Sequence, residues 1–183
     1  MKKIMTSGLY DEEILEEFAN SPLRVSVIVS VALMDRMLEE LIKKSVVDDP
    51  KIVKKIFDDN KLFDTLYNKI SYCYITGIIS EELYNDMEIF RSIRNYCAHL
   101  PKLNDTAIQS IKGKIEKLSL VRTAFTGIEN QTPDWQIRMG FMCIYIALVK
   151  KMARAKHVDK CLNEVHNLGF EKEDYEFMKQ MSI

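Results

Sequence analysis

The sequence predicts an all-α fold, a single-domain multi-helix bundle. Only six glycines and four prolines interrupt the 183 residues, and they fall where helices would begin or end. Between them, apolar residues recur at the spacing of amphipathic helices, and no segment has a convincing strand pattern. A chain of this length suits one domain with its own hydrophobic core. The expected helices cover residues 11–20, 21–47, 51–59, 63–76, 80–99, 105–118 and 132–156.

Capping and breaking residues set the boundaries in the first half of the chain. Ser21 is expected as the N-cap, and Pro22 as the first-turn residue, of the long helix that ends near Val47. The run Asp48-Asp49-Pro50 stops that helix, and the next one follows directly. Gly77 can supply the left-handed residue that closes the helix over residues 63–76.

The second half carries equally clear signals. Ser80 is the expected N-cap of the fifth helix, whose first-turn glutamates complement the positive end of its dipole. Pro101 disfavours α geometry at the residue before it, so this helix should end at or just after His99. Asp105 begins the next helix, and Thr132 followed by proline gives a cap and first turn for the last long one.

Charge and cysteine usage narrow the functional classes. The 26 basic and 27 acidic side chains nearly cancel, which is unlike the basic footprint of a sequence-specific DNA binder. The four cysteines are far apart and the first residues lack the apolar run of a signal peptide, so we expect a cytoplasmic protein with free thiols. The longest apolar run, Met139–Val149, is too short to span a bilayer and predicts a buried core helix rather than a membrane segment.

Two charged residues lie on apolar helix faces. Arg94 falls on the line of Leu83, Met87, Phe90 and Cys97, and Asp35 falls in the middle of the apolar line of the long second helix. A buried guanidinium without an anion would be very costly. We therefore predict that the two helices pack face to face with Asp35 against Arg94, either as a structural ion pair or as support for a site.

The end of the same helix carries a second polar face. Asn95 and His99 are four residues apart and share it, just before the proline. Arg94 and His99 point about 140° apart on an ideal helix, so they cannot hold one small group from the same face. Either the last turn unwinds, or two copies of the chain bring their motif helices together in a composite cleft.

Two resemblances rest on these residues. The string Arg94-Asn95-x-x-Ala98-His99 resembles the Arg-x4-His signature of the HEPN superfamily, all-α domains that include many metal-independent RNA-cleaving enzymes. A longer stretch, KLFDTLYNKISYCYITGIISEELYNDMEIFRSIRNYCAHL, resembles the mannitol operon repressor (MltR-like) family, as does the run from Leu33-Met34-Asp35 to Glu40. That resemblance covers roughly residues 22 to 155.

The resemblances imply two different functions. The MltR-like one implies an oligomeric helical bundle, a homodimer or larger, that regulates transcription by contacting another protein, because no helix-turn-helix or zinc-finger pattern is present. The HEPN one implies a metal-independent endoribonuclease, a toxin or defence effector, with Arg94 on the phosphate, His99 in proton transfer and Asn95 as an orienting group. Neither function requires a cofactor.

The chain is expected to divide at about residue 156. Residues 1–156 form the MltR-like domain, and residues 157–183 form a C-terminal extension of two short helices that packs on the domain or on a partner. His157, Cys161 and His166 have metal-like spacings. A fourth ligand is not evident, so we interpret them as ordinary tail residues and expect no metal.

Overall fold

The computed structural model describes residues 16, 18–59, 62–100 and 102–160, and the part of the chain it describes is helical with no strand. This confirms the predicted all-α bundle. The short helix expected over residues 11–20 lies largely outside the described residues, although residues 18–20 are helical. The elements are α2 (Leu23–Ser45), α3 (Pro50–Lys54), the π-helical turn η1 (Lys55–Asp59), α4 (Leu66–Ile75), α5 (Glu81–His99), α6 (Asp105–Ile115), α7 (Leu120–Ala124), the 3₁₀ turn η2 (Ile128–Asn130) and α8 (Pro133–Arg154).

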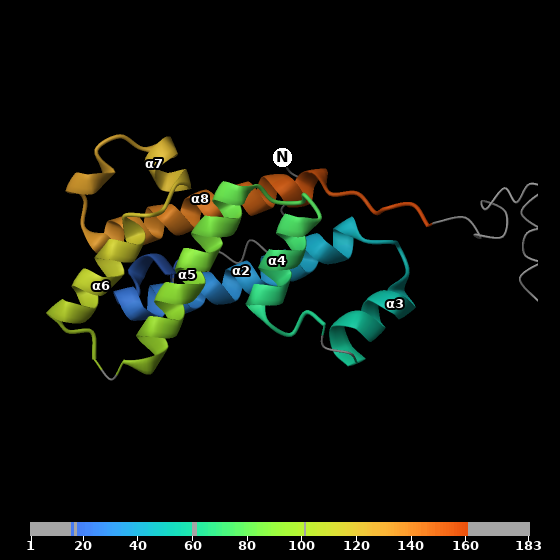
Figure 1. Cartoon of the computed structure of the whole chain (residues 1–183), viewed down its shortest axis with the longest axis horizontal. Coiled ribbons are helices and arrows are strands. Elements are labelled where there is room, and N and C mark those ends of the chain that lie inside the picture. Colours follow the sequence, from blue (N-terminus) through green and yellow to red (C-terminus); the bar gives the residue numbers. More distant parts are fainter. Residues whose placement is uncertain (1–15, 17, 60–61, 101, 161–183) are drawn as a thin grey trace, which may run out of the picture.

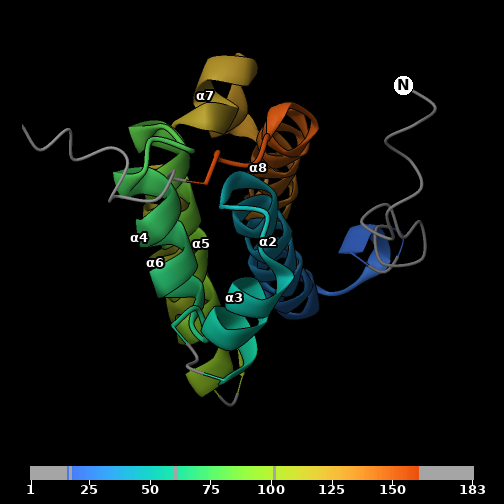
Figure 2. The same ribbon diagram turned by 90° about the vertical axis from the view of Figure 1, so that its right-hand side faces the viewer.

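The helices form two layers. Helices α4, α5 and α6 lie in one layer, and the two longest helices, α2 and α8, lie in the other (Figures 1 and 2). Helix α2 packs against α8, α5 and α4, and α8 also packs against α5 and α6, so both long helices join the two layers. Helix α7 lies on α8 at one end of the bundle, and α3 lies at the other end (Figure 1).

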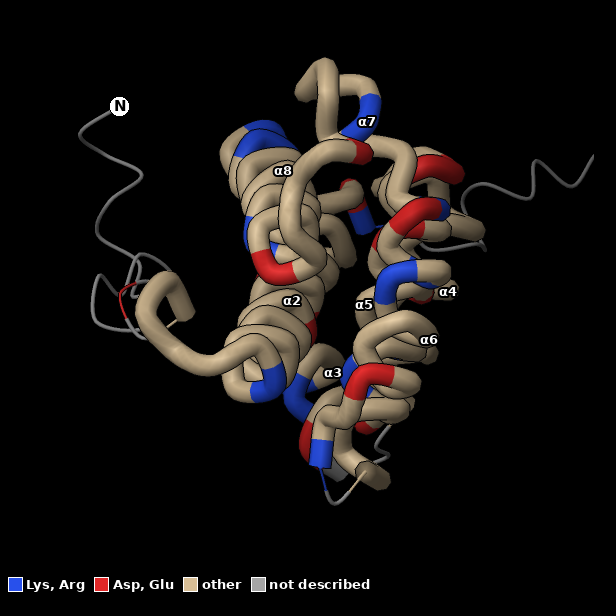
Figure 3. The backbone as a smooth tube through the Cα atoms, turned by 90° about the vertical axis from the view of Figure 1, so that its left-hand side faces the viewer, with Lys and Arg blue, Asp and Glu red and all other residues tan. Residues whose placement is uncertain are grey.

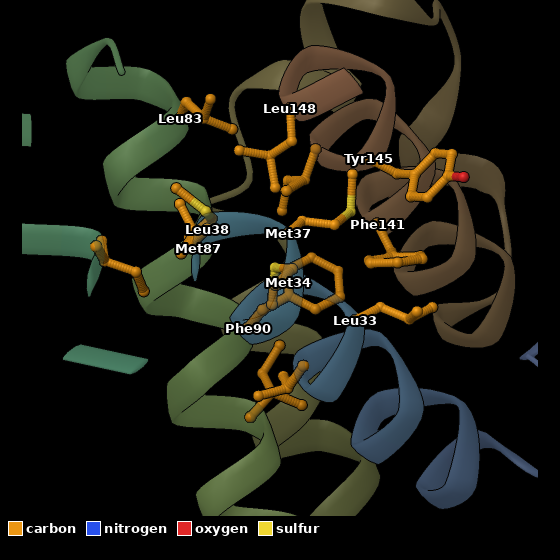
Figure 4. Close-up of a cluster of buried hydrophobic side chains, with 14 of the residues drawn as sticks. Leu33, Met34, Met37, Leu38, Leu83, Met87, Phe90, Phe141, Tyr145 and Leu148 are labelled. Atoms are coloured by element: carbon orange, nitrogen blue, oxygen red, sulfur yellow. The ribbon is translucent and has the colours of Figure 1, made fainter. Parts of the chain in front are cut away.

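The core lies where α2, α5 and α8 meet. Side chains from the three helices converge there, with Phe90 and Phe141 among the largest that are fully buried (Figure 4). Full burial of side chains of this size stabilises the fold by about 1.5–3 kcal/mol each relative to exposure. The labelled members of this cluster are Leu33, Met34, Met37, Leu38, Leu83, Met87, Phe90, Phe141, Tyr145 and Leu148.

Local capping explains most helix boundaries. The side chains of Ser80 and Thr132 accept hydrogen bonds from the backbone N–H of Leu83 and Trp135, as predicted for N-caps. Gly77 has φ 72°, which confirms the left-handed residue expected after the fourth helix. Helix α5 ends at His99, where the sequence placed its end.

The structure differs from the predicted helices in several segments. The helix predicted over 63–76 begins only at Leu66, because the side chain of Thr65 caps it. The segment predicted as one helix over 51–59 is a short α-helix followed by a π-helical turn. The helix predicted over 105–118 ends at Ile115, and helix α7, which the sequence did not predict, follows it.

Residues 155–160 leave the end of α8 without helical structure and run to the end of α2. His157 Nδ1 lies 2.8 Å from the carbonyl oxygen of Val46, and the backbone N–H of Val158 donates to the same oxygen. Lys160 Nζ lies 3.2 Å from a carboxylate oxygen of Asp49. The rest of the C-terminal extension, with its two predicted short helices, lies outside the described residues, so the division at residue 156 stays a prediction.

Acidic and basic residues are interspersed along the described helices (Figure 3). No described helix is both long and apolar enough to cross a membrane.

Candidate functional site

Arg94 lies outside the buried stripe of α5, contrary to prediction. The stripe runs through Leu83, Met87, Phe90 and Cys97 as expected, but Ile93 occupies the core position between the last two and Arg94 is exposed. Neighbouring residues on a helix point about 100° apart, so only one of the two can face the core. Burying isoleucine is favourable and desolvating a guanidinium is costly, which explains why Ile93 rather than Arg94 faces the core.

The predicted ion pair between Asp35 and Arg94 is also wrong. Asp35 Oδ2 instead accepts a hydrogen bond from Lys69 Nζ on α4 at 2.9 Å, and Glu39 Oε2, one turn along α2, accepts from the same nitrogen at 3.1 Å. The Lys69 side chain is only 3% exposed, whereas the two carboxylates are 39% and 34% exposed. The buried charge is therefore a lysine of α4, held by two half-solvated acids of α2.

The network continues along the surface of α2. Lys43 Nζ lies 2.7 Å from Glu39 Oε1, so Glu39 bridges two lysines. Burial alone would raise the pKa of Glu39, but the hydrogen bonds and charges of Lys43 and Lys69 outweigh it and lower the pKa below its ordinary value. The carboxylate of Glu39 is consequently ionised at neutral pH and holds α4 against α2.

Asp35 and Arg94 nevertheless line the same cleft, which lies between α2, the start of α4 and α5. Its volume is about 390 Å³. Helix α2 contributes an apolar wall ending in Asp35, and α5 contributes Arg91, Arg94 and Asn95. The lining residues are Ile28, Val31, Ala32, Asp35, Asp64, Thr65, Leu66, Tyr67, Arg91, Arg94 and Asn95. The cleft thus combines an apolar floor with groups of both charges.

The two arginines of the cleft differ in their surroundings. Arg91 forms a bidentate contact with Glu88, at 2.9 and 2.7 Å, and its guanidinium lies over the Tyr67 ring at 5.3 Å from the centroid. The hydrogen bonds from Arg91 to Glu88 raise the pKa of Arg91. Arg94 Nη1 donates to Asn95 Oδ1 at 3.1 Å, and Arg94 makes no ion pair with any described residue. Arg94 can therefore turn to an anion that enters the cleft.

His99 does not belong to the cleft lining. It is exposed at the last position of α5, more than one helical turn beyond Arg94, and the last turn has not unwound to direct it inward. The structure thus brings Arg94 and Asn95 together with Asp35 around one cleft and leaves His99 apart. Within one chain, the three motif residues do not converge.

Arg24 is a residue of this region that the sequence did not reveal. From the first turn of α2, its Nε donates to the carbonyl oxygen of Cys97 at 3.0 Å, and Nη2 donates to the carbonyl oxygens of Cys97 and Leu100. Carbonyls at a helix C-terminus lack partners in the helix and attract a cation. Arg24 therefore fixes the end of the motif helix, and 73 residues separate it from Cys97, so no local pattern indicates the contact.

Asp86 is a second buried acid that sequence reasoning missed. It is fully buried on α5, and its carboxylate accepts from the backbone N–H and hydroxyl of Ser119 and from the backbone N–H of Leu120, all within 2.9 Å. These groups lie at the start of α7. Asp86 therefore anchors α7 to α5 and does not face the cleft.

The described thiols are unsuited to nucleophilic chemistry. Burial raises the pKa of Cys73 to about 12, and burial also raises the pKa of Cys97 within the motif and of Cys143. Cys161 lies outside the described residues. Among the residues that the structure describes, no group of three or more His, Cys, Asp or Glu side chains is placed to hold a metal ion.

Comparison with known proteins yields a structural likeness only. No family model matches the chain, and no curated protein matches its sequence. The fold is similar to that in the X-ray structure of the MtlR–HPr complex from Escherichia coli, with a TM-score of 0.54 and 19% sequence identity, over 78% of this chain and 96% of that chain. The chain has an MtlR-like fold. The likeness agrees with the MltR-like resemblance of the sequence as far as the fold is concerned.

Proposed function

We propose that this chain is a regulatory protein of the mannitol-operon-repressor-like type, which acts by binding a protein partner rather than by reading DNA bases. The observation that carries this proposal is the likeness to MtlR, a protein whose structure was solved in a complex with HPr. HPr or a protein of similar surface is accordingly the first partner to test.

The cleft between α2, α4 and α5 is the surface we assign to this contact. Ile28 and Tyr67 are 40% and 49% exposed beside it, and apolar side chains that remain accessible within a polar surround are typical of protein contact sites. Arg94 of α5 and Asp35 of α2 both line this cleft. Charges of both signs around an apolar floor favour a partner with complementary charges and fix its orientation.

The test is titration of the purified chain with purified HPr in a calorimeter. We expect saturable binding that weakens at least about tenfold in Ile28→Asp, because burying an unpaired carboxylate at an apolar contact is unfavourable. Ile75→Asp is the matched control, since Ile75 is 78% exposed at the end of α4 and outside the cleft. Absence of binding would refute HPr as the partner, and equal affinity of the two variants would refute the cleft as the site.

A HEPN-type endoribonuclease is the second candidate, and one observation favours it. Arg94 is exposed and is not committed to Asp35, so its guanidinium can bind a phosphate. In this mechanism His99 would transfer a proton to or from the RNA oxygens while Arg94 neutralises the phosphate and Asn95 orients it. Because His99 lies outside the cleft, the histidine would have to come from a second copy or from a rearranged last turn.

Incubation with mixed cellular RNA in EDTA tests this second candidate. RNA cleavage by the wild-type chain that disappears in His99→Ala and Arg94→Ala would support the enzyme. Intact RNA with the wild-type chain would exclude metal-independent cleavage of these substrates and leave the regulator as the sole proposal.

A further inference from the structure

A second cleft lies between α5 and the end of α6, two helices that pack against each other in one layer (Figure 1). Its volume is about 480 Å³, larger than that of the cleft at Arg94. Two lysines line it from the α6 side, and polar and apolar side chains line it from α5. The lining residues are Asn85, Glu88, Ile89, Ser92, Lys114 and Lys117.

The two lysines of this cleft have no acidic partner of their own. Lys114 Nζ donates to Ser92 Oγ at 2.7 Å, and no carboxylate of a described residue lies within ion-pair distance of either ammonium group. Both oxygens of Glu88 are bound by Arg91, at 2.9 and 2.7 Å. The negative end of the α6 dipole amounts to about half an elementary charge, so it compensates the two lysines only in part. The cleft therefore carries a net positive charge.

The hydroxyl of Ser92 bonds across the cleft rather than within its own helix. In α2, the hydroxyls of Ser26 and Ser45 donate to carbonyl oxygens one turn earlier, an arrangement common for serine inside a helix. Ser92 Oγ instead accepts from Lys114, and its proton has no acceptor in the part of the chain that the structure describes. This proton and the remaining protons of the Lys114 ammonium group are therefore available to a ligand.

We propose that this cleft binds a small phosphate monoester, with the phosphate held by Lys114, Lys117 and the hydroxyl of Ser92. Such a phosphate carries about two negative charges at neutral pH, which match the two ammonium groups, and its oxygens accept charge-assisted hydrogen bonds. The half-buried Ile89 offers an apolar surface to the organic group, and the exposed amide of Asn85 can bond to its polar atoms. Pockets of about 300–1,000 Å³ are typical of small-molecule sites.

The phosphate site is separate from the cleft proposed for the protein partner. The two clefts share no lining residue. The inference therefore goes beyond the proposed function and does not depend on it.

Nuclear magnetic resonance of the isotope-labelled full chain, titrated with β-glycerol phosphate, tests the proposal. At about pH 7.5, where the phosphate is a dianion, we expect saturable shifts of the amide signals around Ser92 and Lys114. Lys114→Met and Lys117→Met should each raise the Kd at least about tenfold, because each removes a charge-assisted hydrogen bond. Lys117 is exposed, so its replacement tests the site without disturbing the core.

Two further variants control for other cations of the chain. Lys112→Met removes a half-buried lysine of α6 that does not line the cleft, and Arg94→Met removes the guanidinium of the first cleft. Both should leave the Kd measured at Ser92 unchanged. Sodium chloride at the same ionic strength controls for screening. Inorganic phosphate should bind more weakly than the ester, because it lacks the group that contacts Ile89.

Shifts that stay linear in ligand concentration would overturn the proposal, as would equal affinity of Lys117→Met and the wild type. Inorganic phosphate that binds as tightly as β-glycerol phosphate would overturn the assignment of an ester. Each of these results is independent of whether HPr binds to the cleft at Arg94.

Discussion

Removing the charge of Lys69, the buried lysine of α4, should destabilise the fold much less than removing its two acidic partners. In the double variant Asp35→Ala, Glu39→Ala, the ammonium group of Lys69, whose side chain is 3% exposed in the wild type, loses both of its carboxylate partners. Stranding a buried charge in this way costs about 3–5 kcal/mol. Lys69→Met removes the charge instead, keeps a side chain of similar length, and leaves two carboxylates that are already 39% and 34% exposed.

The expected cost of Lys69→Met is correspondingly small. Repulsion between two acids four residues apart on a helix amounts to about 0.2–0.5 kcal/mol, and replacement of a buried ion by an apolar side chain of similar volume is often neutral. We therefore expect the free energy of unfolding to fall by about 1 kcal/mol or less. Glu39 keeps its contact with Lys43 in this variant.

Urea unfolding measures both changes in the free energy of unfolding, and thermal unfolding measures the changes in Tm, each followed by circular dichroism. For a chain of this size, 1 kcal/mol corresponds to a change in Tm of about 2–4 °C, so the double variant should lose roughly 6–20 °C and Lys69→Met only a few. Equal destabilisation by the two changes would refute the reasoning, because it would mean that the attraction itself, and not the desolvated lysine, dominates the free energy of the network.

Three further predictions concern the contacts around the site. Asp86→Ala should lower the free energy of unfolding by about 3–5 kcal/mol in urea titrations, because three donors at the start of α7 lose their acceptor, whereas the exposed Asp48→Ala should cost under about 0.5 kcal/mol. Arg24→Met should cost about 1.5–3 kcal/mol and accelerate amide exchange in the last turn of α5, and unchanged exchange there would contradict the assigned clamp. The pKa of Glu39 is lower in the folded chain than its ordinary value of 4.5, so the ionised carboxylate stabilises the fold fully above pH 4.5. This stabilisation is lost as the pH falls through the lower pKa of the folded state. Tm should therefore fall less steeply between pH 5 and 3 in Glu39→Gln than in the wild type.

Features set by neighbouring residues could be predicted from the sequence. Ser80, Thr132 and Gly77 act through hydrogen bonds and backbone conformations within a few residues of themselves, so their consequences do not depend on the rest of the fold. The end of α5 at His99 follows from the proline two residues later in the same way. These signals fixed the helical fold class and most of the helix boundaries.

Features set by contacts between distant helices could not be predicted in this way. The periodicity of α5 permits a core stripe through either Ile93 or Arg94, and the packing of α5 against α2, α4 and α8 buries Ile93. Lysine is normally exposed, so no local pattern predicts that Lys69 is buried. The wrong prediction for Asp35 has both of these causes. Asp35 does pair with a cation from another helix, but the cation is Lys69 of α4 rather than Arg94 of α5.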